Sequence, residues 1–232
     1  MSKDTERVRR KIAKNQNTPS EELQILAYDK LKWVRLEVAR NPNTPAKALE
    51  YLAADEDYEI CQEVAFNHST PIKILEILAT HKNIKVRQAV AFNFSNPNPN
   101  IPVHLLEKLA RDENFEVYWQ VLYNPKTPVS LLFEAFAKHK QNDGVRHALA
   151  SNPSTPTIIL DELADYENEC GTILEEIADN PNTSLATLEE LATNEEICFY
   201  VRQYAIFHNK FVSIPLLEQL ANHQDWEIRR AV

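Results

Sequence analysis

One stretch decides the fold: Val34-Arg35-Leu36-Glu37-Val38-Ala39-Arg40-Asn41-Pro42-Asn43-Thr44-Pro45. Variants of its Asn-Pro-x-Thr-Pro part recur along the 232-residue chain, most often 26 residues apart, with their first residues at Asn15, Asn41, Asn67, Asn98, Asn124, Asn152, Asn180 and Asn209. A fixed period in this range is the signature of a repeat array. We therefore predict a single repeat domain over 1–232, in which a half-repeat at 1–14 precedes eight repeats that begin at these asparagines.

Each repeat reads as two helices. After Pro45, the residues Leu49, Leu52 and Ala53 follow at helical spacing and form one apolar stripe. A second helical piece carries the Val-Arg-x-x-Val-Ala pattern, whose branched residues lie one turn apart and face the same core. Thr44 before Pro45 suits an N-cap followed by proline at the first helical position. In the first repeat, Thr18-Pro19-Ser20-Glu21 adds the glutamate of a capping box. The pattern predicts an all-α fold.

The eight asparagines have a structural role in this reading. A short amide side chain bonds neighbouring backbone groups in a turn and tolerates unusual dihedral angles. When repeats stack, the asparagines line up as an internal polar ladder. We expect this role to explain them better than a role in binding.

Composition indicates a folded intracellular protein. Hydrophobic residues make up 44% of the chain, which is enough for a continuous core. The first residues lack the apolar segment of a signal peptide, and no apolar run approaches the length of a membrane span. The three cysteines, Cys61, Cys170 and Cys198, lie far apart without Cys-x-x-Cys spacing, so free thiols in a reducing compartment are expected. These features predict a soluble cytoplasmic protein.

Each repeat resembles those of the leucine-rich repeat variant family. The shared pattern is Leu-Ala, then a short acidic segment between the two helices that we call the corner, such as Asp55-Glu56-Asp57, and then Val-Arg-x-x-Val-Ala-x-Asn-Pro-x-Thr-Pro. The resemblance extends over essentially the whole chain, from Val8-Arg9 to Ile228-Arg229. It implies a right-handed superhelix in which α-helices alternate with short 3₁₀-helices, although the residues themselves leave the second helix open between α and 3₁₀. Some relatives carry a cysteine-rich iron–sulfur module at the N-terminus. Because no cysteine precedes Asn15, that cofactor is not carried over, and we expect none.

The third repeat departs from the period. Asn93-Phe94-Ser95-Asn96-Pro97 reads as a five-residue insertion, and Asn93 could serve as the anchor in place of Asn98. Additions at one place in a solenoid become loops on one face. The insertion is either a binding lip or drift that a surface loop tolerates.

Catalytic motifs are absent from the sequence. No metal-binding His-Glu-x-x-His, phosphate loop or Gly-x-Ser-x-Gly occurs. Three of the histidines, His81, His139 and His223, share to within one residue the corner position that Asp55 and Asp112 occupy elsewhere, which favours capping of a helix end over metal binding. We expect no enzyme activity and no metal site.

An arginine recurs after the inward Val or Ile of the second helix, at Arg9, Arg35, Arg87, Arg146, Arg202 and Arg229, interrupted by Cys61, Tyr118 and Leu174. Such a column could bind phosphate or carboxylate partners. The preferred interpretation is structural: the aliphatic stem packs between repeats while the guanidinium pairs with an acidic corner or a carbonyl.

Aromatic residues supply the candidate partner-binding positions. Phe66, Phe92 and Tyr123 each precede the asparagine that closes a second helix, and Phe94, Tyr118 and Trp119 fall in the same middle region. Aromatic clusters are favoured at the centres of interfaces. Filling of the core is the competing explanation for these residues.

Charge is distributed unevenly along the chain. Residues 1–50 carry eleven Lys or Arg against seven acids, whereas residues 147–201 carry twelve acids and no Lys or Arg. The overall charge of −9 disfavours nucleic-acid binding, because the phosphate backbone needs a basic surface.

Three functions were weighed. The favoured one is a non-catalytic scaffold that binds a protein partner, such as a basic segment, on its concave face or at 147–201. The alternative is structural self-assembly, in which the basic end of one copy contacts the acidic part of another and produces end-to-end oligomers. A nucleic-acid or repair enzyme built on helical repeats would need a basic groove, which the charge balance disfavours. No membrane partner is expected.

Overall fold

The computed structural model describes residues 3–92, 101–165, 171–194, 197–207, 221–222 and 226–231, together with residues 214 and 218. All regular structure in these ranges is α-helical, and they contain no strand. The all-α prediction is confirmed. No helix within these ranges combines the length and the apolar character that a membrane span requires.

The chain divides into two compact units, residues 1–124 and 125–232, and the single repeat domain over 1–232 stays a prediction. We call them unit 1 and unit 2. Unit 1 contains α1 (Lys3–Lys14), α2 (Ser20–Leu26), α3 (Lys32–Arg40), α4 (Ala46–Leu52), α5 (Tyr58–Phe66), α6 (Ile72–Leu78), α7 (Ile84–Ala91), α8 (Val103–Leu109) and α9 (Phe115–Leu122). Unit 2 contains α10 (Val129–His139), α11 (Asp143–Ser151), α12 (Thr157–Ala164), α13 (Gly171–Asp179), α14 (Leu185–Thr193), α15 (Phe199–Phe207) and α17 (Trp226–Ala231).

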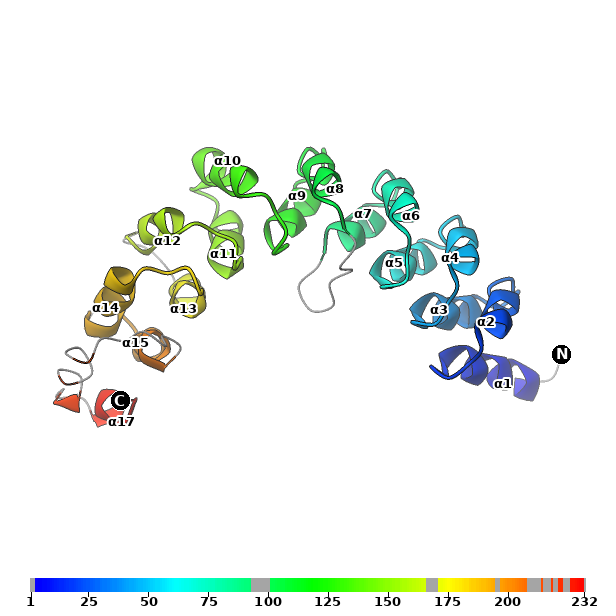
Figure 1. Cartoon of the computed structure of the whole chain (residues 1–232), viewed down its shortest axis with the longest axis horizontal. Helices are drawn as coiled ribbons and strands as arrows, with labels where there is room; N and C mark the ends of the chain where they lie inside the picture. Colours follow the sequence, from blue (N-terminus) through cyan, green and yellow to red (C-terminus); the bar gives the residue numbers. More distant parts are fainter. Residues whose placement is uncertain are drawn as a thin grey trace. The chain divides into compact units, whose positions relative to one another are not determined.

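The helices form two layers in each unit. We call the helix that follows each Thr-Pro turn an A helix (even-numbered, α2 to α14) and the helix with the Val-Arg pair a B helix (odd-numbered). Figure 1 shows the A helices along one side of each unit and the B helices along the other. Each B helix of unit 1 packs on the next, and α11, α13 and α15 of unit 2 do the same. The outward surface of the B layer is called the B face.

The core lies between the two layers. Leu49 and Leu52 of α4 are fully buried, as are Val38 of α3 and Val64 of α5. Burial of one such side chain stabilises the fold by about 1.5–3 kcal/mol. Since A helices of only seven residues are too short to be stable alone, this packing holds them in place.

The asparagines connect each repeat to the one before it. The Asn41 side-chain amide donates to the carbonyl oxygens of Ala13 (2.8 Å) and Asn15 (2.9 Å), and its Oδ1 accepts from the backbone N–H of Asn43 (3.0 Å). Asn67 and Asn180 make the same three contacts. Because all three are buried, the amide satisfies carbonyl groups that water cannot reach.

The threonine of the turn does not cap the helix that follows it, so that prediction was wrong. The N-cap of α4 is Pro45, which makes no side-chain capping bond, and the Thr44 hydroxyl instead donates backwards to the carbonyl of Val38 (2.5 Å). Thr70 and Thr155 are bound in the same way. The capping box expected at Thr18 also does not form, since the Thr18 hydroxyl donates to Ile12. The turn threonine therefore stabilises the end of the preceding B helix.

A side-chain cap appears where the turn proline is replaced. Ser184 stands in that position and accepts the backbone N–H of Thr187 as the N-cap of α14 (3.0 Å). B helices begin with such caps more often: Asp57, Asn83 and Asn114 each accept the N–H two residues ahead. The corners that precede these three B helices, at 53–57, 79–83 and 110–114, thus define where the helices start.

Of the two alternatives for the second helix, the described repeats take the α form. The handedness of the superhelix stays a prediction from the family resemblance. The insertion at 93–97, together with Phe94 and the anchors Asn98 and Asn209, lies outside the described residues.

Candidate functional site

The B layer of unit 1 holds five of the six predicted aromatic residues, and the sixth, Phe94, lies outside the described residues. Phe66 at the end of α5 and Phe92 at the end of α7 meet edge to face, with ring centroids 5.9 Å apart. Both are only partly buried. The two residues belong to neighbouring repeats. The spacing in the sequence predicted that they occupy equivalent positions, but it could not predict that their rings are in contact.

The other aromatic residues of this prediction pair within one repeat. On α9, the rings of Trp119 and Tyr123 lie 6.2 Å apart, and Tyr118 contacts Phe115 at 5.5 Å. Trp119, Tyr123 and Tyr118 are all partly buried, so they contribute to packing and also reach the surface. Their role in binding a partner stays a prediction.

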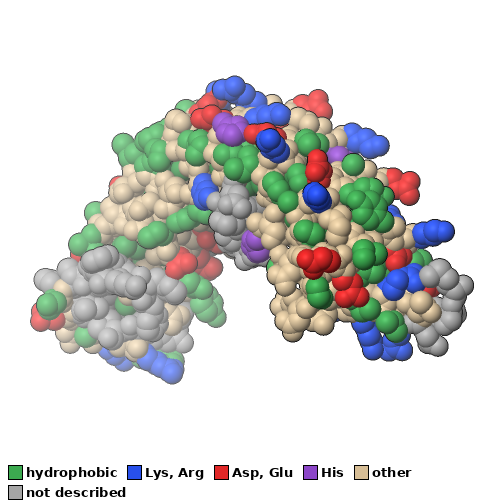
Figure 2. Space-filling model, turned by 45° about the vertical axis from the view of Figure 1, so that its right-hand side comes forward, with side chains coloured by type: hydrophobic (Ala, Val, Ile, Leu, Met, Phe, Trp, Pro, Cys, Tyr) green, Lys and Arg blue, Asp and Glu red, His purple; other side chains and the backbone are tan. Residues whose placement is uncertain are grey.

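Charged side chains on the B helices of unit 1 are paired between repeats. Arg10 of α1 donates two hydrogen bonds to Glu37 of α3, at 3.0 and 2.7 Å, and Arg40 of α3 pairs with Glu63 of α5 at 2.6 Å. Figure 2 shows acidic, basic and hydrophobic side chains interspersed on one face of the part that includes unit 1. Unit 1 therefore presents a surface on which these carboxylates are already neutralised.

The B face of unit 2 differs from that of unit 1. Its helix α13 carries Glu175, Glu176 and Asp179, which all reach the surface. Glu176 occupies the repeat position of Glu37 and Glu63, and the contact recorded for its carboxylate is to His147 of α11 at 4.0 Å. Within the described residues, neither Glu175 nor Glu176 forms a salt bridge with a lysine or arginine.

Three arginines of the column, Arg9, Arg35 and Arg87, are bound to acidic corners as the structural interpretation predicted. Arg35 binds both carboxylate oxygens of Asp55 in the next corner, at 2.6 and 3.1 Å, and donates to the carbonyl of Asp29 in its own corner at 2.9 Å. Arg9 with Asp29 and Arg87 with Asp112 repeat the arrangement. We call this contact the corner clamp. It uses the bidentate geometry that arginine and carboxylate share.

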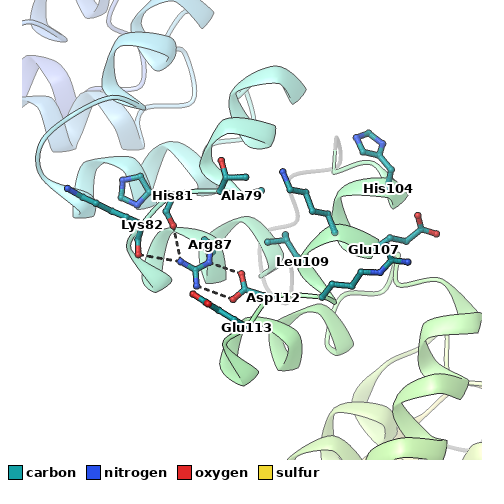
Figure 3. Close-up of a pocket in the computed structure, with 12 residues that line it drawn as sticks. Ala79, His81, Lys82, Arg87, His104, Glu107, Leu109, Asp112 and Glu113 are labelled. Atoms are coloured by element: carbon teal, nitrogen blue, oxygen red, sulfur yellow. Dashed lines mark hydrogen bonds and ion pairs between the residues drawn. The ribbon is translucent and has the colours of Figure 1, made fainter.

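The corner clamp of the third repeat forms the floor of a hollow. The hollow has a volume of about 730 Å³, and Figure 3 shows Arg87 between Asp112 and the carbonyls of His81 and Lys82. The labelled side chains Lys82 and His104 lie on opposite sides and point away from the clamp (Figure 3). The charged groups at the rim do not converge on one point, so we assign no ligand to the hollow.

The clamp shifts the ionisation of both partners. Burial of Asp112 opposes its ionisation, but the hydrogen bonds from Arg87 and from the backbone N–H of Asn114 outweigh burial and hold the pKa below its usual value. The hydrogen bond to Asp112 raises the pKa of Arg87. Both groups are thus stabilised in their charged forms.

Cys61 replaces the clamp arginine in one repeat, and the corner of the next repeat lacks the aspartate that such an arginine would bind. The buried thiol donates to the carbonyl of Asp55 (3.3 Å), and burial raises its pKa to about 11. The following corner carries His81 instead of aspartate, and its Nδ1 accepts the backbone N–H of Asn83 (3.0 Å). His81 therefore shapes the corner, while the N-cap of α7 is Asn83 and not the histidine. His139 is the last residue of α10, and His223 lies outside the described residues.

Tyr28 and Tyr51 were not among the residues predicted from the sequence. Their exposed rings lie with centroids 4.2 Å apart and planes tilted by 43°, and they line an equivalent but smaller hollow of about 450 Å³ between the first two corners. The equivalent positions around the larger hollow hold Thr80 and Lys108. The presence of two tyrosines where another repeat pair has polar residues is the sequence feature that could have identified them.

The chain was compared with known proteins. A family model described as leucine rich repeat variant matches residues 33–57. A solved structure, "a leucine-rich repeat variant with a novel repetitive protein structural motif", has a TM-score of 0.57 and 23% identity, over 96% of this chain and 84% of that one. An engineered protein has a TM-score of 0.39 and 17% identity, over 97% and 81% of the two chains. No curated protein matches.

These findings agree with the repeat and the two-layer helical fold. The matched residues include Val34-Arg35, Asn41 and the acidic corner, which are the residues that carry the resemblance. The solved repeat protein shows the fold of nearly the whole chain. In both its sequence repeat and its fold, this helical repeat protein resembles the leucine-rich repeat variant family.

Proposed function

We propose that this protein is a non-catalytic repeat scaffold that binds a basic segment of another protein on the B face of unit 2. The charge of the two units supports the proposal. Unit 1 carries seventeen Lys or Arg and seventeen acids, whereas unit 2 carries eight Lys or Arg and seventeen acids, so unit 2 accounts for the whole net charge of −9. A surface with such a field attracts cationic partners and raises their association rate.

The observation that carries the proposal is the difference between equivalent glutamates. Glu37 and Glu63 in unit 1 are each paired with an arginine of the preceding B helix. At the same position of unit 2, the ion pair recorded for Glu176 among the described residues is with His147, and Glu175 lies beside it on α13. A partner's lysines or arginines would complete on unit 2 the pairing that unit 1 makes internally.

The surroundings of α13 suit a basic segment in a second way. Tyr200 and Tyr204 of the neighbouring α15 are exposed, and α13 packs directly on α15. A tyrosine ring attracts lysine and arginine side chains through its negatively charged face. Because the B helices are held by their neighbours, little conformational freedom is lost when a partner binds. In this proposal the protein acts in the cytoplasm, where Cys61 stays a thiol.

A labelled peptide of alternating lysine and serine tests the proposal. We expect binding that weakens with salt and is lost or reduced at least about tenfold in Glu175→Gln/Glu176→Gln. The matched control is Glu21→Gln/Glu22→Gln, which removes the same charge from exposed positions on α2. Equal weakening by the two double variants, or the absence of binding at low salt, would contradict the proposal.

Capture of partners from a cell extract gives the complementary measurement. The wild-type chain and both double variants are immobilised, and bound proteins are identified after chemical crosslinking. Supporting proteins are those captured by the wild type and the α2 control but not by the α13 variant. If every captured protein is also retained by the α13 variant, the B face of unit 2 is not the binding surface.

A further inference from the structure

Helix α1 exposes a core position. Its Val8 aligns with Val34, Ile60 and Val86 in the repeat, and these residues are between 0% and 1% exposed. Val8 is 53% exposed. A position that is buried in every other described B helix is therefore uncovered on α1.

A row of unpaired cations runs beside this valine. Arg7, Lys11 and Lys14 are exposed and lie at positions i, i+4 and i+7, which places them on one stripe of the helix. None of the three forms a salt bridge within the described residues. By contrast, Arg9 and Arg10 on the same helix are bound to Asp29 and Glu37. The outer face of α1 thus combines an exposed apolar residue with free positive charge.

The basic excess of the first fifty residues comes from this helix and its flanks. Residues 1–14 contain six Lys or Arg against two acids, and residues 15–50 contain five of each. The acidic counterpart is on unit 2, where the partly exposed Glu175 and Glu176 are neighbours on α13. Two cations spaced by one turn of α1 can each approach one of these two carboxylates.

We propose that the outer face of α1 docks on the α13 surface of a second copy of this chain. The cations Arg7, Lys11 and Lys14 surround the carboxylates of Glu175 and Glu176 there, and the contact covers Val8. The inference rests on the proposed function, because it assigns a partner to the same acidic face. The partner's basic segment is then α1 of another molecule.

Self-association measured by sedimentation velocity tests this inference. We expect the wild-type chain to form dimers or larger species at low salt, with loss of association at high salt because screened charges no longer attract. Two charge-reversed variants, Arg7→Glu/Lys11→Glu and Glu175→Lys/Glu176→Lys, should each be monomeric alone. Their equimolar mixture should associate again, since the reversed charges of one variant complement those of the other.

Lys47→Glu/Lys73→Glu is the matched control, because it reverses two exposed charges on A helices of unit 1 and should associate like the wild type. A wild type that is monomeric at low salt and high concentration, or a mixture that fails to associate, would overturn the inference. Binding of the lysine–serine peptide by a monomeric wild type would leave the proposed function standing. Failure of both measurements would reject both.

Discussion

At the scale of single residues, the asparagine at the start of each turn does the most to join the repeats. Its amide donates to two carbonyl groups of the preceding repeat and accepts one N–H of its own turn. Only an amide supplies two donors and an acceptor in so short a side chain. The requirement explains why this residue type recurs although neighbouring positions vary.

Replacing Asn67 by Ala should lower the free energy of unfolding by about 2 kcal/mol or more, because two buried carbonyls lose their donor. Asn67→Asp should cost more near neutral pH, since a carboxylate would face two carbonyl oxygens. Urea unfolding measures both values. Asn17→Asp, at an exposed position, is the control and should change stability little. Equal stability of Asn67→Asp and the wild type would refute the ladder role of this residue.

Two cysteines should differ sharply in reactivity. Cys61 is fully buried and its pKa is raised to about 11, whereas Cys198 is exposed. Since the thiolate is the reactive form, a thiol reagent near neutral pH should label Cys198 quickly and Cys61 only after unfolding. Mass spectrometry in a Cys170→Ser background measures the two rates. Rapid labelling of Cys61 in the folded chain would show that its repeat opens locally.

At the scale of elements, the corner clamp links three B helices of unit 1, α1, α3 and α7, to the corner of the next repeat. Arg35 and Asp55 are 20 residues apart and Arg87 and Asp112 are 25 apart, so a clamp spans the insertion in the third repeat as well as a regular repeat. The clamp holds the corner of the next repeat in place. The B helix that begins at the end of that corner is positioned with it.

Acid should weaken the Arg87–Asp112 clamp. The pKa of Asp112 in the folded chain lies below its usual 3.8, so the clamp contributes its full stability above that value and loses it as the pH falls through the folded pKa. Asp112→Asn should be less stable near neutral pH and should lose less stability on acidification. Thermal unfolding across this pH range provides the comparison. Parallel pH curves for the two proteins would mean that Asp112 contributes nothing to the acid dependence.

Cys61 and His81 occupy the positions that hold arginine and aspartate in a corner clamp. Two substitutions, Cys61→Arg and His81→Asp, should therefore create a clamp there. Cys61→Arg alone should destabilise the chain by about 3 kcal/mol, because a buried guanidinium lacks its carboxylate. Addition of His81→Asp supplies that carboxylate in the next corner and should recover most of the loss. Chemical unfolding of the four proteins gives the coupling energy. A double variant no more stable than Cys61→Arg would show that the two positions are independent.

At the scale of the whole molecule, helix contacts join neighbouring repeats, and the two units differ in net charge. Helices pack on the next repeat, as α3 on α5 and α13 on α15. The net charge of −9 resides in unit 2. A chain built in this way transmits a local defect to its neighbours more strongly than to distant repeats.

A defect in unit 2 should therefore affect unit 2 first. Asn180→Asp disrupts the contacts of Asn180 with Ala150 and Asn152. Fluorescence of variants that retain a single tryptophan should show a lower unfolding midpoint at Trp226 in unit 2 and a smaller change at Trp119 in unit 1. Equal shifts of both midpoints would indicate that the two units unfold as one.

The sequence by itself determined the repeat, the all-α class and the core. These follow from local spacing: apolar residues such as Leu49 and Leu52 fall on one face of a helix, and Pro45 and its equivalents mark where helices begin. The structural interpretation was also correct for Arg9, Arg35 and Arg87, since a guanidinium beside a core valine has an acidic corner within reach. The sequence could also reveal that residues 147–201 lack any basic residue.

Only the tertiary structure decided which groups meet across repeats. Thr44 bonds back to Val38 rather than capping the next helix, Arg35 selects Asp55, and Phe66 meets Phe92. Glu37 is neutralised by Arg10, while Glu176 has His147 at the position equivalent to Arg10. The physical reason is that these choices depend on how one helix lies against another, which local periodicity does not encode. A repeat pattern specifies the faces that become buried, and the stacking of those faces sets which charges remain available to a partner.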